Sequence, residues 1–264
     1  MSDDAVTVDV EDGVATLTLN QPDVRNAMTR DLSRGLIAAL DDLEGGDARV
    51  LVLEGAGPAF CAGGDVNAMV ERMAGDTSLA EAVRLIRQTT SRAVERVHDF
   101  YLPTVAKVDG PAFGAGGNLA VAADLQLASD EAEISFGFRQ VGLAVDSGTS
   151  YLLPRLVGEN VAKELVFTGE RVDAERAGEL GLFNRVYPDD SFDERANELI
   201  ERIASGPTVA LRHSKRLIDE GMESSLSQAM ANEAAAQAAV FETGDHEEGV
   251  EAFMEKRKPE FEGS

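Results

Sequence analysis

Residues 104–120 read T-V-A-K-V-D-G-P-A-F-G-A-G-G-N-L-A, and the rest of the chain is organised around this stretch. Residues 104–108 form a short apolar strand, D-G-P predicts a turn, and the glycines that follow lead into a helix. Because glycine lacks a Cβ, another backbone or a ligand can approach closely there. N–H groups at a helix start have no intrahelical partner and suit a phosphate or an oxyanion. Tight packing alone would also account for the glycines.

A second glycine loop lies about fifty residues earlier in the chain. Residues 49–54 are a short apolar run that predicts a buried strand, and residues 55–65 form a loop that leads into a helix. The motifs A-F-C-A-G-G-D and A-F-G-A-G-G-N thus both follow an apolar strand and both open a helix. Together they can aim two backbone N–H groups at one carbonyl oxygen, as an oxyanion hole does.

Strands and helices alternate through the first part of the chain, and this order predicts an α/β architecture. A hairpin is expected over 5–19, helices over 29–43, 66–73 and 78–98, and strands over 125–128 and 133–136.

From residue 147 onward the pattern is mainly helical. We expect helices over 148–156, 160–167, 173–180, 190–204, 207–220, 223–242 and 245–256, with a strand over 183–187. The helix over 223–242 carries many small apolar side chains, which permit close helix contact. It is therefore a candidate oligomer surface, with a plain core helix as the alternative.

The chain is strongly acidic. It has 48 Asp and Glu against 24 Lys and Arg, a formal net charge of −24 over 264 residues. Such charge destabilises a compact state by self-repulsion, which salt screens, so we expect a halophilic protein adapted to high salt. An ordinary acidic protein is the alternative. We expect no nucleic-acid partner, because phosphate binding needs a basic face.

The remaining composition indicates a cytoplasmic soluble protein of one domain, or one domain with a helical appendage. We find no apolar run long enough to span a membrane and no signal-peptide pattern at the N-terminus. Cys61 is the single cysteine, and the three histidines lack metal-ligand spacing, so we expect no disulfide and no metal.

Several motifs in order resemble the crotonase (enoyl-CoA hydratase/isomerase) family over nearly the whole chain. They are N-Q-P-D-V-R-N-A (20–27), A-F-C-A-G-G-D-V (59–66), P-T-V-A-K-V-D-G-P-A-F-G-A-G-G (103–117), D-L-Q-L-A-S (124–129), L-P-R-L-V-G (153–158), F-T-G-E-R-V-D-A-E-R-A-G-E-L-G-L (167–182) and a C-terminal E-G-V-E-A-F-M-E-K-R-K-P-E-F. The resemblance implies a spiral of ββα units over residues 1–190. It also implies a helical region over 191–264 that forms a homotrimer, often as a dimer of trimers.

The resemblance further implies an acyl-CoA thioester substrate whose enolate is stabilised by two main-chain amides, without a separate cofactor. By similarity these amides belong to Gly64 and Ala115, and alanine supplies the N–H as well as the family's glycine does. Side chains at the edge that holds coenzyme A matter less than its main chain. The substrate-binding residues implied are Val24, Arg25, Ala27, Ala62, Asp65, Val66, Asn118 and Gln140.

The departures from the family pattern concern acid–base chemistry. Hydratases of the family carry two glutamates, and this chain has Asn118 and Gln140 at those positions. Hydration needs one group to activate water and another to deliver a proton, and neutral amides do neither near neutral pH. The stretch G-L-A-V-D-S-G (142–148) resembles isomerases of the family, including those that act on ring epoxides of phenylacetyl-CoA, and it implies that Asp146 is the base.

Alternatives remain at each of these positions. Asp146 can cap the helix that follows it, Asp65 can cap its own loop, and Asn118 can cap its helix or bind substrate or water. The leading hypothesis is an isomerase that shifts a double bond (Δ3 to Δ2) or opens a ring epoxide. A hydratase with unusual acid–base groups and a non-catalytic acyl-CoA-binding protein are the alternatives. Acyl chain length stays open.

Overall fold

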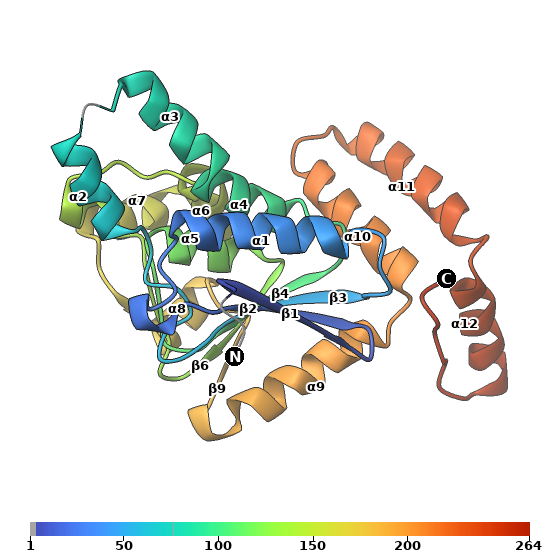
Figure 1. Cartoon of the computed structure of the whole chain (residues 1–264). Helices are drawn as coiled ribbons and strands as arrows, with labels where there is room; N and C mark the ends of the chain where they lie inside the picture. The colour runs from blue at the N-terminus through green and yellow to red at the C-terminus, as the bar shows by residue number, and fades with distance from the viewer. Residues whose placement is uncertain (1–3, 76) are drawn as a thin grey trace.

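The computed structural model describes residues 4–75 and 77–264, and a six-stranded sheet forms its centre (Figure 1). The strand order is β1-β2-β3-β4-β6-β9. The first pair is an antiparallel hairpin, and every later neighbour is parallel. The strands are β1 (Val6–Glu11), β2 (Val14–Leu19), β3 (Val50–Gly55), β4 (Thr104–Val108), β6 (Leu125–Ser129) and β9 (Arg185–Tyr187).

Both faces of the central strands are buried, as their continuous apolar runs predict. In β3, Leu51 and Leu53 belong to the main core, whereas Val50 and Val52 belong to a second cluster on the opposite face. Successive side chains of a strand point to opposite faces, so one apolar run serves two layers.

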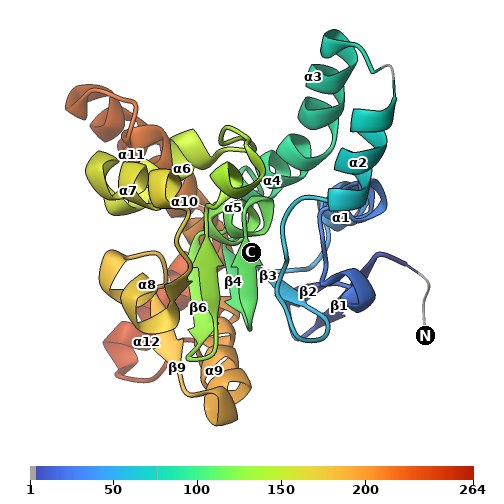
Figure 2. The same cartoon turned by 90° about the vertical axis from the view of Figure 1, so that its left-hand side faces the viewer.

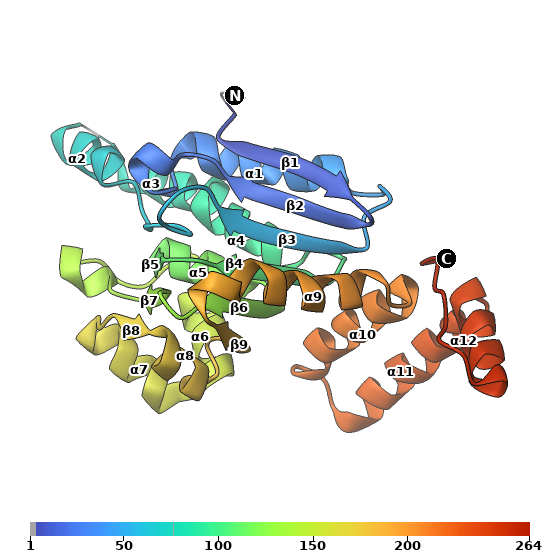
Figure 3. The ribbon, with the colours of Figure 1, turned by 90° about the horizontal axis from the view of Figure 1, so that it is seen from below.

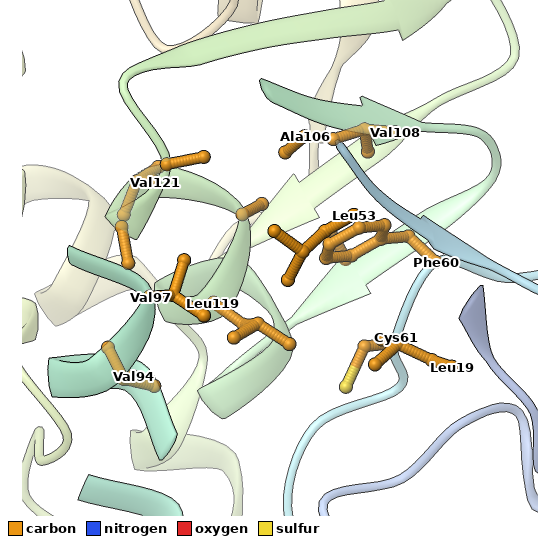
Figure 4. Packing of buried hydrophobic residues seen from close by; sticks show 14 of the residues in the cluster. Leu19, Leu53, Phe60, Cys61, Val94, Val97, Ala106, Val108, Leu119 and Val121 are labelled. Atoms are coloured by element: carbon orange, nitrogen blue, oxygen red, sulfur yellow. The ribbon is translucent and has the colours of Figure 1, made fainter. Parts of the chain in front are cut away.

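Helices cover the two faces unequally. The main core lies under α1 (Arg30–Leu43), α4 (Thr90–His98) and α5 (Ala115–Ala122), and α9 (Phe192–Ala204) covers the other face. Every residue of α5 is buried. Figure 4 shows Leu119 of α5 facing Val97 of α4 inside this core. The helix that supplies a predicted oxyanion donor is therefore fixed on all sides.

A smaller sheet of order β5-β7-β8 lies beside the first, with strands Pro111–Phe113, Glu133–Ser135 and Val172–Asp173. Strand β5 occupies the predicted turn after β4 and pairs with β7 in parallel. Strand pairs followed by a helix thus recur as β1-β2-α1, β4-β5-α5 and β6-β7-α6. This is the expected ββα spiral.

The local predictions agree with most element boundaries. One exception is the helix expected over 78–98, which is broken at Thr89, with φ −117° and ψ −100°, and strands β5 and β8 were not predicted. The other elements before residue 192 are η1 (Pro22–Val24), α2 (Val66–Ala74), α3 (Leu79–Gln88), η2 (Phe138–Val141), α6 (Thr149–Val157), α7 (Glu159–Thr168), α8 (Ala174–Leu180) and η3 (Asp189–Ser191). Figure 2 shows α2 and α3 projecting from one end of the body.

Of the last three helices, the first is tied to the body by Lys215, which pairs with Asp124 and donates to the Leu102 carbonyl, and the other two extend away from it, as Figures 1 and 3 show. They are α10 (Thr208–Gly221), α11 (Leu226–Val240) and α12 (Gly244–Glu255). Only Ala236 is buried in α11, so the core-helix alternative for this segment is wrong. The proposed division at residue 190 stays a prediction, and α9, the first helix beyond it, packs on the sheet. In the described part of the chain, no helix is both long and apolar enough to cross a membrane.

Candidate active site

The two glycine loops cross each other and are joined by main-chain hydrogen bonds. The Cys61 N–H donates to the Pro111 carbonyl over 3.1 Å, and the Phe113 N–H donates to the Cys61 carbonyl over 3.0 Å. A Cβ on Gly116 would lie 2.1 Å from the Cys61 carbonyl oxygen, and one on Gly63 would lie 2.5 Å from the Phe113 carbonyl oxygen. Glycine is therefore required at both positions, because main chain packs directly against main chain.

The predicted oxyanion donors, Gly64 and Ala115, lie at this crossing. Ala115 is the first residue of α5, so its N–H has no intrahelical acceptor. Gly114 turns the chain into the helix with φ 52°. On the other loop, a Cβ on Gly63 would lie 3.7 Å from the Ala115 nitrogen, which brings the two loops side by side. In the part of the chain that the structure describes, neither donor N–H has a hydrogen-bond acceptor.

The edge predicted to hold coenzyme A draws on two segments that contact each other. Val24 and Val66 expose 44% and 60% of their surface. Arg25 adopts a left-handed φ of 52°, and its carbonyl accepts the Ala62 N–H over 2.9 Å. Ala27 is half-buried, and the residue after it, Met28, pairs with Gly64. These predicted residues thus adjoin the oxyanion loops and leave apolar surface free for a ligand.

Asn26 holds this edge in place, a role that the sequence analysis did not assign although the residue stands in the motif over 20–27. Its side chain is fully buried, accepts the Gln21 N–H over 2.9 Å and donates to the carbonyls of Ala56 and Ala59 over 2.9 and 2.8 Å. It has φ 53°, and asparagine tolerates this conformation better than most residues. Its place in the motif over 20–27 and this tolerance are the signals that the sequence offers, because the two carbonyl acceptors lie 30 and 33 positions away.

Asp65 caps helix α2. Its Oδ1 accepts the N–H groups of Asn67 over 2.9 Å and Ala68 over 3.2 Å. The side chain therefore has the capping role that the sequence analysis weighed against substrate binding.

Asn118 and Gln140 stand at the positions where hydratases of the family have glutamates. The side-chain amides of both form hydrogen bonds to other residues of the protein. Asn118 is fully buried and donates from Nδ2 to the Asp146 carbonyl over 2.9 Å, while its Oδ1 accepts the Thr149 hydroxyl over 2.7 Å. Gln140 is exposed and donates from Nε2 to the Gly169 carbonyl over 2.9 Å. Their main intramolecular role is thus to join segments, and neither is a carboxylate.

Asp146 has a half-buried carboxylate, and its main-chain carbonyl is hydrogen-bonded to Asn118 of α5. Burial raises its pKa above the ordinary value of 3.8, and a hydrogen bond from the Ser147 hydroxyl partly opposes this. The helix that follows begins after Gly148, and Asp146 makes no side-chain cap to it. Asn118 lies three residues after Ala115, so about one helical turn separates the oxyanion donor from the residue that binds Asp146.

Other reactive groups have no part in this arrangement. Burial raises the pKa of the Cys61 thiol to about 12, so the thiolate needed of a nucleophile is absent near neutral pH. Among the described residues, no group of three or more His, Cys, Asp or Glu side chains could hold a metal ion. Near the C-terminus, Lys256, Arg257 and Lys258 are all exposed, and Arg257 is paired with Glu248 and Glu255.

A cavity of about 440 Å³ lies apart from these residues, between residues 98–101 and helix α10. Its lining mixes His98, Arg212 and Lys215 with Asp219 and contains none of the predicted site residues. This cavity is therefore separate from the crossing loops, where the predicted oxyanion donors lie.

Comparison with known proteins agrees with the geometry. The family described as enoyl-CoA hydratase/isomerase matches residues 9–264. A Rhodobacter capsulatus protein named "Probable enoyl-CoA hydratase" is 35% identical over 266 residues and covers 100% of both chains. The 1,2-epoxyphenylacetyl-CoA isomerase of Escherichia coli is 34% identical over 256 residues, covering 96% of this chain and 97% of its own.

A solved structure gives the same result for the fold. The crystal structure of an enoyl-CoA hydratase from Bacillus anthracis matches with a TM-score of 0.91 at 31% identity, covering 98% of this chain and 100% of that chain. The resemblance stated from the motifs is therefore confirmed. The chain has the crotonase fold and belongs to the enoyl-CoA hydratase/isomerase family.

Proposed function

We propose that the protein is an acyl-CoA isomerase that shifts a double bond through a thioester enolate, with Asp146 as the base and acid. One observation carries the proposal. Asn118 and Gln140 stand where hydratases of the family have glutamates, and both are engaged in hydrogen bonds within the protein. The half-buried carboxylate next to this arrangement is Asp146, whose pKa is raised by burial.

The reaction needs two parts. The N–H groups of Gly64 and Ala115 donate to the thioester oxygen and stabilise the charge that develops there. The Asp146 carboxylate removes a proton from the α-carbon of a 3-enoyl-CoA, which gives a dienolate. The same carboxyl group then returns the proton to the γ-carbon, which gives the 2-enoyl-CoA. No proton or electron is gained overall, so neither a metal nor a redox cofactor is needed. Opening of a ring-epoxide thioester is the second substrate possibility.

A raised pKa suits this role. A carboxylate with an elevated pKa is a stronger base, and after accepting the proton it is a sufficiently weak acid to hold it until transfer. The isomerase named for 1,2-epoxyphenylacetyl-CoA and a Streptococcus mutans relative named trans-2-decenoyl-[acyl-carrier-protein] isomerase, 32% identical, support an isomerase.

A hydratase is the second candidate, and the names of relatives such as the Rhodobacter capsulatus protein favour it. It would require Asp146 to activate an ordered water, with no second carboxyl group at Asn118 or Gln140 to deliver the proton. A protein that binds acyl-CoA without turnover is the third candidate.

We also propose a homotrimer, alone or paired, built on the C-terminal helices, in a cytoplasmic protein. Large apolar side chains are exposed along α10–α12, and such surface usually marks an interface. They are Ile218, Met222, Leu226, Met230, Phe241, Val250, Phe253 and Met254. Sedimentation of the purified protein tests this assembly, and a monomer at micromolar concentration would contradict it.

The proposed reaction is tested with Asp146→Ala. Removal of a general base typically costs about 10²–10⁴-fold, so conversion of 3-hexenoyl-CoA to the 2-enoyl isomer should fall by that factor. The rate is followed by the absorbance of the conjugated thioester, alongside hydration of crotonyl-CoA. Asp219→Asn is the matched control, because desolvation also raises the pKa of Asp219, which lies on α10.

The outcomes separate the candidates. Wild-type isomerisation that disappears in Asp146→Ala and persists in Asp219→Asn supports the proposal. Isomerisation that survives Asp146→Ala eliminates the proposed base. Fast hydration with slow isomerisation in the wild type favours the hydratase, and tight acyl-CoA binding without either reaction favours the third candidate.

A further inference from the structure

A buried polar cluster joins the Asp146 turn to helix α5. Asn118 and Thr149 are 0% and 1% exposed, and Ser147 and Ser91 of α4 are 6% and 9% exposed. Buried polar groups are costly unless they are hydrogen-bonded, and these are. The Ser91 and Ser147 hydroxyl oxygens lie 3.5 Å apart, and Asn118 contacts both Asp146 and Thr149.

The hydrogen bonds of this cluster converge on one carbonyl. The Asp146 carbonyl accepts from Asn118 Nδ2 over 2.9 Å and from the Thr149 N–H over 3.0 Å. A carbonyl oxygen has two lone pairs, so these two donors already satisfy it. The Thr149 hydroxyl, 3.0 Å from the same oxygen, lies closer to Asn118 Oδ1 at 2.7 Å and donates its single proton there.

The turn that this cluster holds is strained. Ser147 has φ 47° and Gly148 has φ 94°, and a serine at positive φ persists only where surrounding structure enforces it. Residues 141–144, just before the turn, are exposed. The backbone of Asp146 is therefore fixed from the Asn118 and Thr149 side, since the preceding segment offers little packing.

We propose that Asn118 and Thr149 are positioning residues, which fix Asp146 relative to the Ala115 N–H for proton transfer. The inference rests on the proposed function of Asp146. It explains why an amide serves here: Asn118 must donate to one neighbour and accept from the other, and an ionised carboxylate can only accept. The asparagine at a hydratase glutamate position thus has its own role in this site, which is to orient the base.

Thr149→Val is the main test, because it keeps the shape of the side chain and removes the hydroxyl. Misplacement of a catalytic group by about 1 Å costs on the order of 10²-fold in rate, so kcat for 3-hexenoyl-CoA should fall by roughly 10–100-fold with KM within about twofold. Thr149→Ser restores the hydroxyl and should return kcat to within about threefold of wild type. Asn118→Asp, which keeps size but loses the donor, should resemble Thr149→Val.

A double variant separates positioning from a structural role. If Thr149 acts through Asp146, Thr149→Val should have no further effect on kcat in the Asp146→Asn background. An independent reduction in that background, or a Thr149→Val enzyme with normal kcat per folded molecule, overturns the inference. Because Thr149→Ser and Thr149→Val decide it, the outcome does not depend on whether Asn118 variants fold.

Failure of the proposed function gives a different pattern. Full activity in Asp146→Asn would show that Asp146 is not the base, and the positioning role would be overturned with it. An inactive Asp146→Asn together with a fully active Thr149→Val would leave the proposed function intact and overturn the positioning role alone.

Discussion

The two halves of the active site are held together in different ways. The oxyanion half, residues 59–64 and 111–117, is fixed by main-chain hydrogen bonds and by glycines whose Cβ atoms would collide with carbonyl oxygens. The acid–base half, residues 137–149 together with Asn118, is fixed by side-chain amides and hydroxyls that reach to main-chain carbonyls and to one another.

This difference separates two tasks. Main-chain N–H groups stabilise a thioester oxygen whatever side chains surround it, so the oxyanion half suits every reaction that passes through an enolate. In the proposed mechanism, the side chains of the other half determine which group removes the proton from the substrate and which group returns it. A change in the oxyanion half should therefore abolish all activity, whereas a change in the acid–base half should act on one reaction.

Gly116→Ala should have the largest effect. The new Cβ would meet the Cys61 carbonyl oxygen at 2.1 Å, so the two loops must separate and the Ala115 N–H must move. Loss of one oxyanion donor costs about 10²–10³-fold, and we expect isomerisation and any hydration to fall together by at least that factor. Overpacking should also lower the free energy of unfolding by about 1–3 kcal/mol. Initial rates and thermal denaturation measure both.

Ala115→Gly is the matched control for Gly116→Ala. It changes the adjacent residue and keeps the donor N–H, so its rates should stay within about threefold of wild type. Equal losses in the two variants would contradict the view that close main-chain approach, and not general sensitivity of α5, fixes the oxyanion half.

The oxyanion half was also the half that the sequence predicted best. Glycine motifs after apolar strands are local patterns, and their spacing and order carried the family resemblance. The hairpin and the long helix over 29–43 were likewise predictable, because alternation and helical periodicity are local. The break at Thr89 and the short strand β5 were not, since β5 exists only through its pairing with β7.

The acid–base half was predicted in its members but not in its connections. The sequence indicated Asn118, Gln140 and Asp146 by similarity, yet left the role of Asn118 open. Its bonds join positions 28 and 31 residues apart, and no local pattern reports such contacts. The hydrogen bonds of Asn26 to the Ala56 and Ala59 carbonyls were not predicted, for the same reason. Hydrogen bonds between distant segments depend on the tertiary fold, which periodicity does not specify.

Restoring both hydratase glutamates tests the acid–base half directly. In Asn118→Glu/Gln140→Glu, the side chain at 118 is longer, charged and buried, and it cannot donate to the Asp146 carbonyl. We expect isomerisation to fall by roughly 10–100-fold and crotonyl-CoA hydration not to rise, because the turn that carries Asp146 is displaced. Gln140→Glu alone is the control: it loses the bond to the Gly169 carbonyl, but at this exposed position water can replace that donor, so the isomerisation rate should change by less than about threefold.

A clear gain of hydration in the double variant would contradict the view that the hydrogen bonds around Asp146 determine which reaction occurs. It would mean that two carboxylates on this scaffold suffice for water addition, whatever holds Asp146. The assay pair used for Asp146→Ala measures both rates on the same preparation.

The smallest expected effect is a shift in pH dependence with salt. Burial raises the pKa of Asp146 above 3.8 although the hydrogen bond from the Ser147 hydroxyl lowers it, and in the proposed reaction the ionised carboxylate is the active form. Activity should therefore fall as pH falls through this raised pKa. The sign for stability is opposite: protonation favours the folded state, so the contribution of Asp146 to the unfolding free energy decreases as pH rises from 3.8 through the raised value. Asp146→Asn should accordingly be inactive near neutral pH without being less stable.

Salt acts on this titration through the formal net charge of −24. Surrounding negative charge favours the protonated carboxyl group, and the screening length falls from about 30 Å at 0.01 M to about 3 Å at 1 M salt. The acid limb of kcat/KM should thus move to lower pH by roughly a few tenths of a unit in 1 M KCl, while the part due to burial remains. Melting temperature should rise over the same range if the protein is adapted to salt. Titration of the oxyanion half should not contribute to this shift, because its one ionisable side chain, Cys61, has a pKa of about 12 and stays protonated over this pH range. An acid limb that is independent of salt would show that the charge of the chain does not reach Asp146, and that local burial alone sets the base.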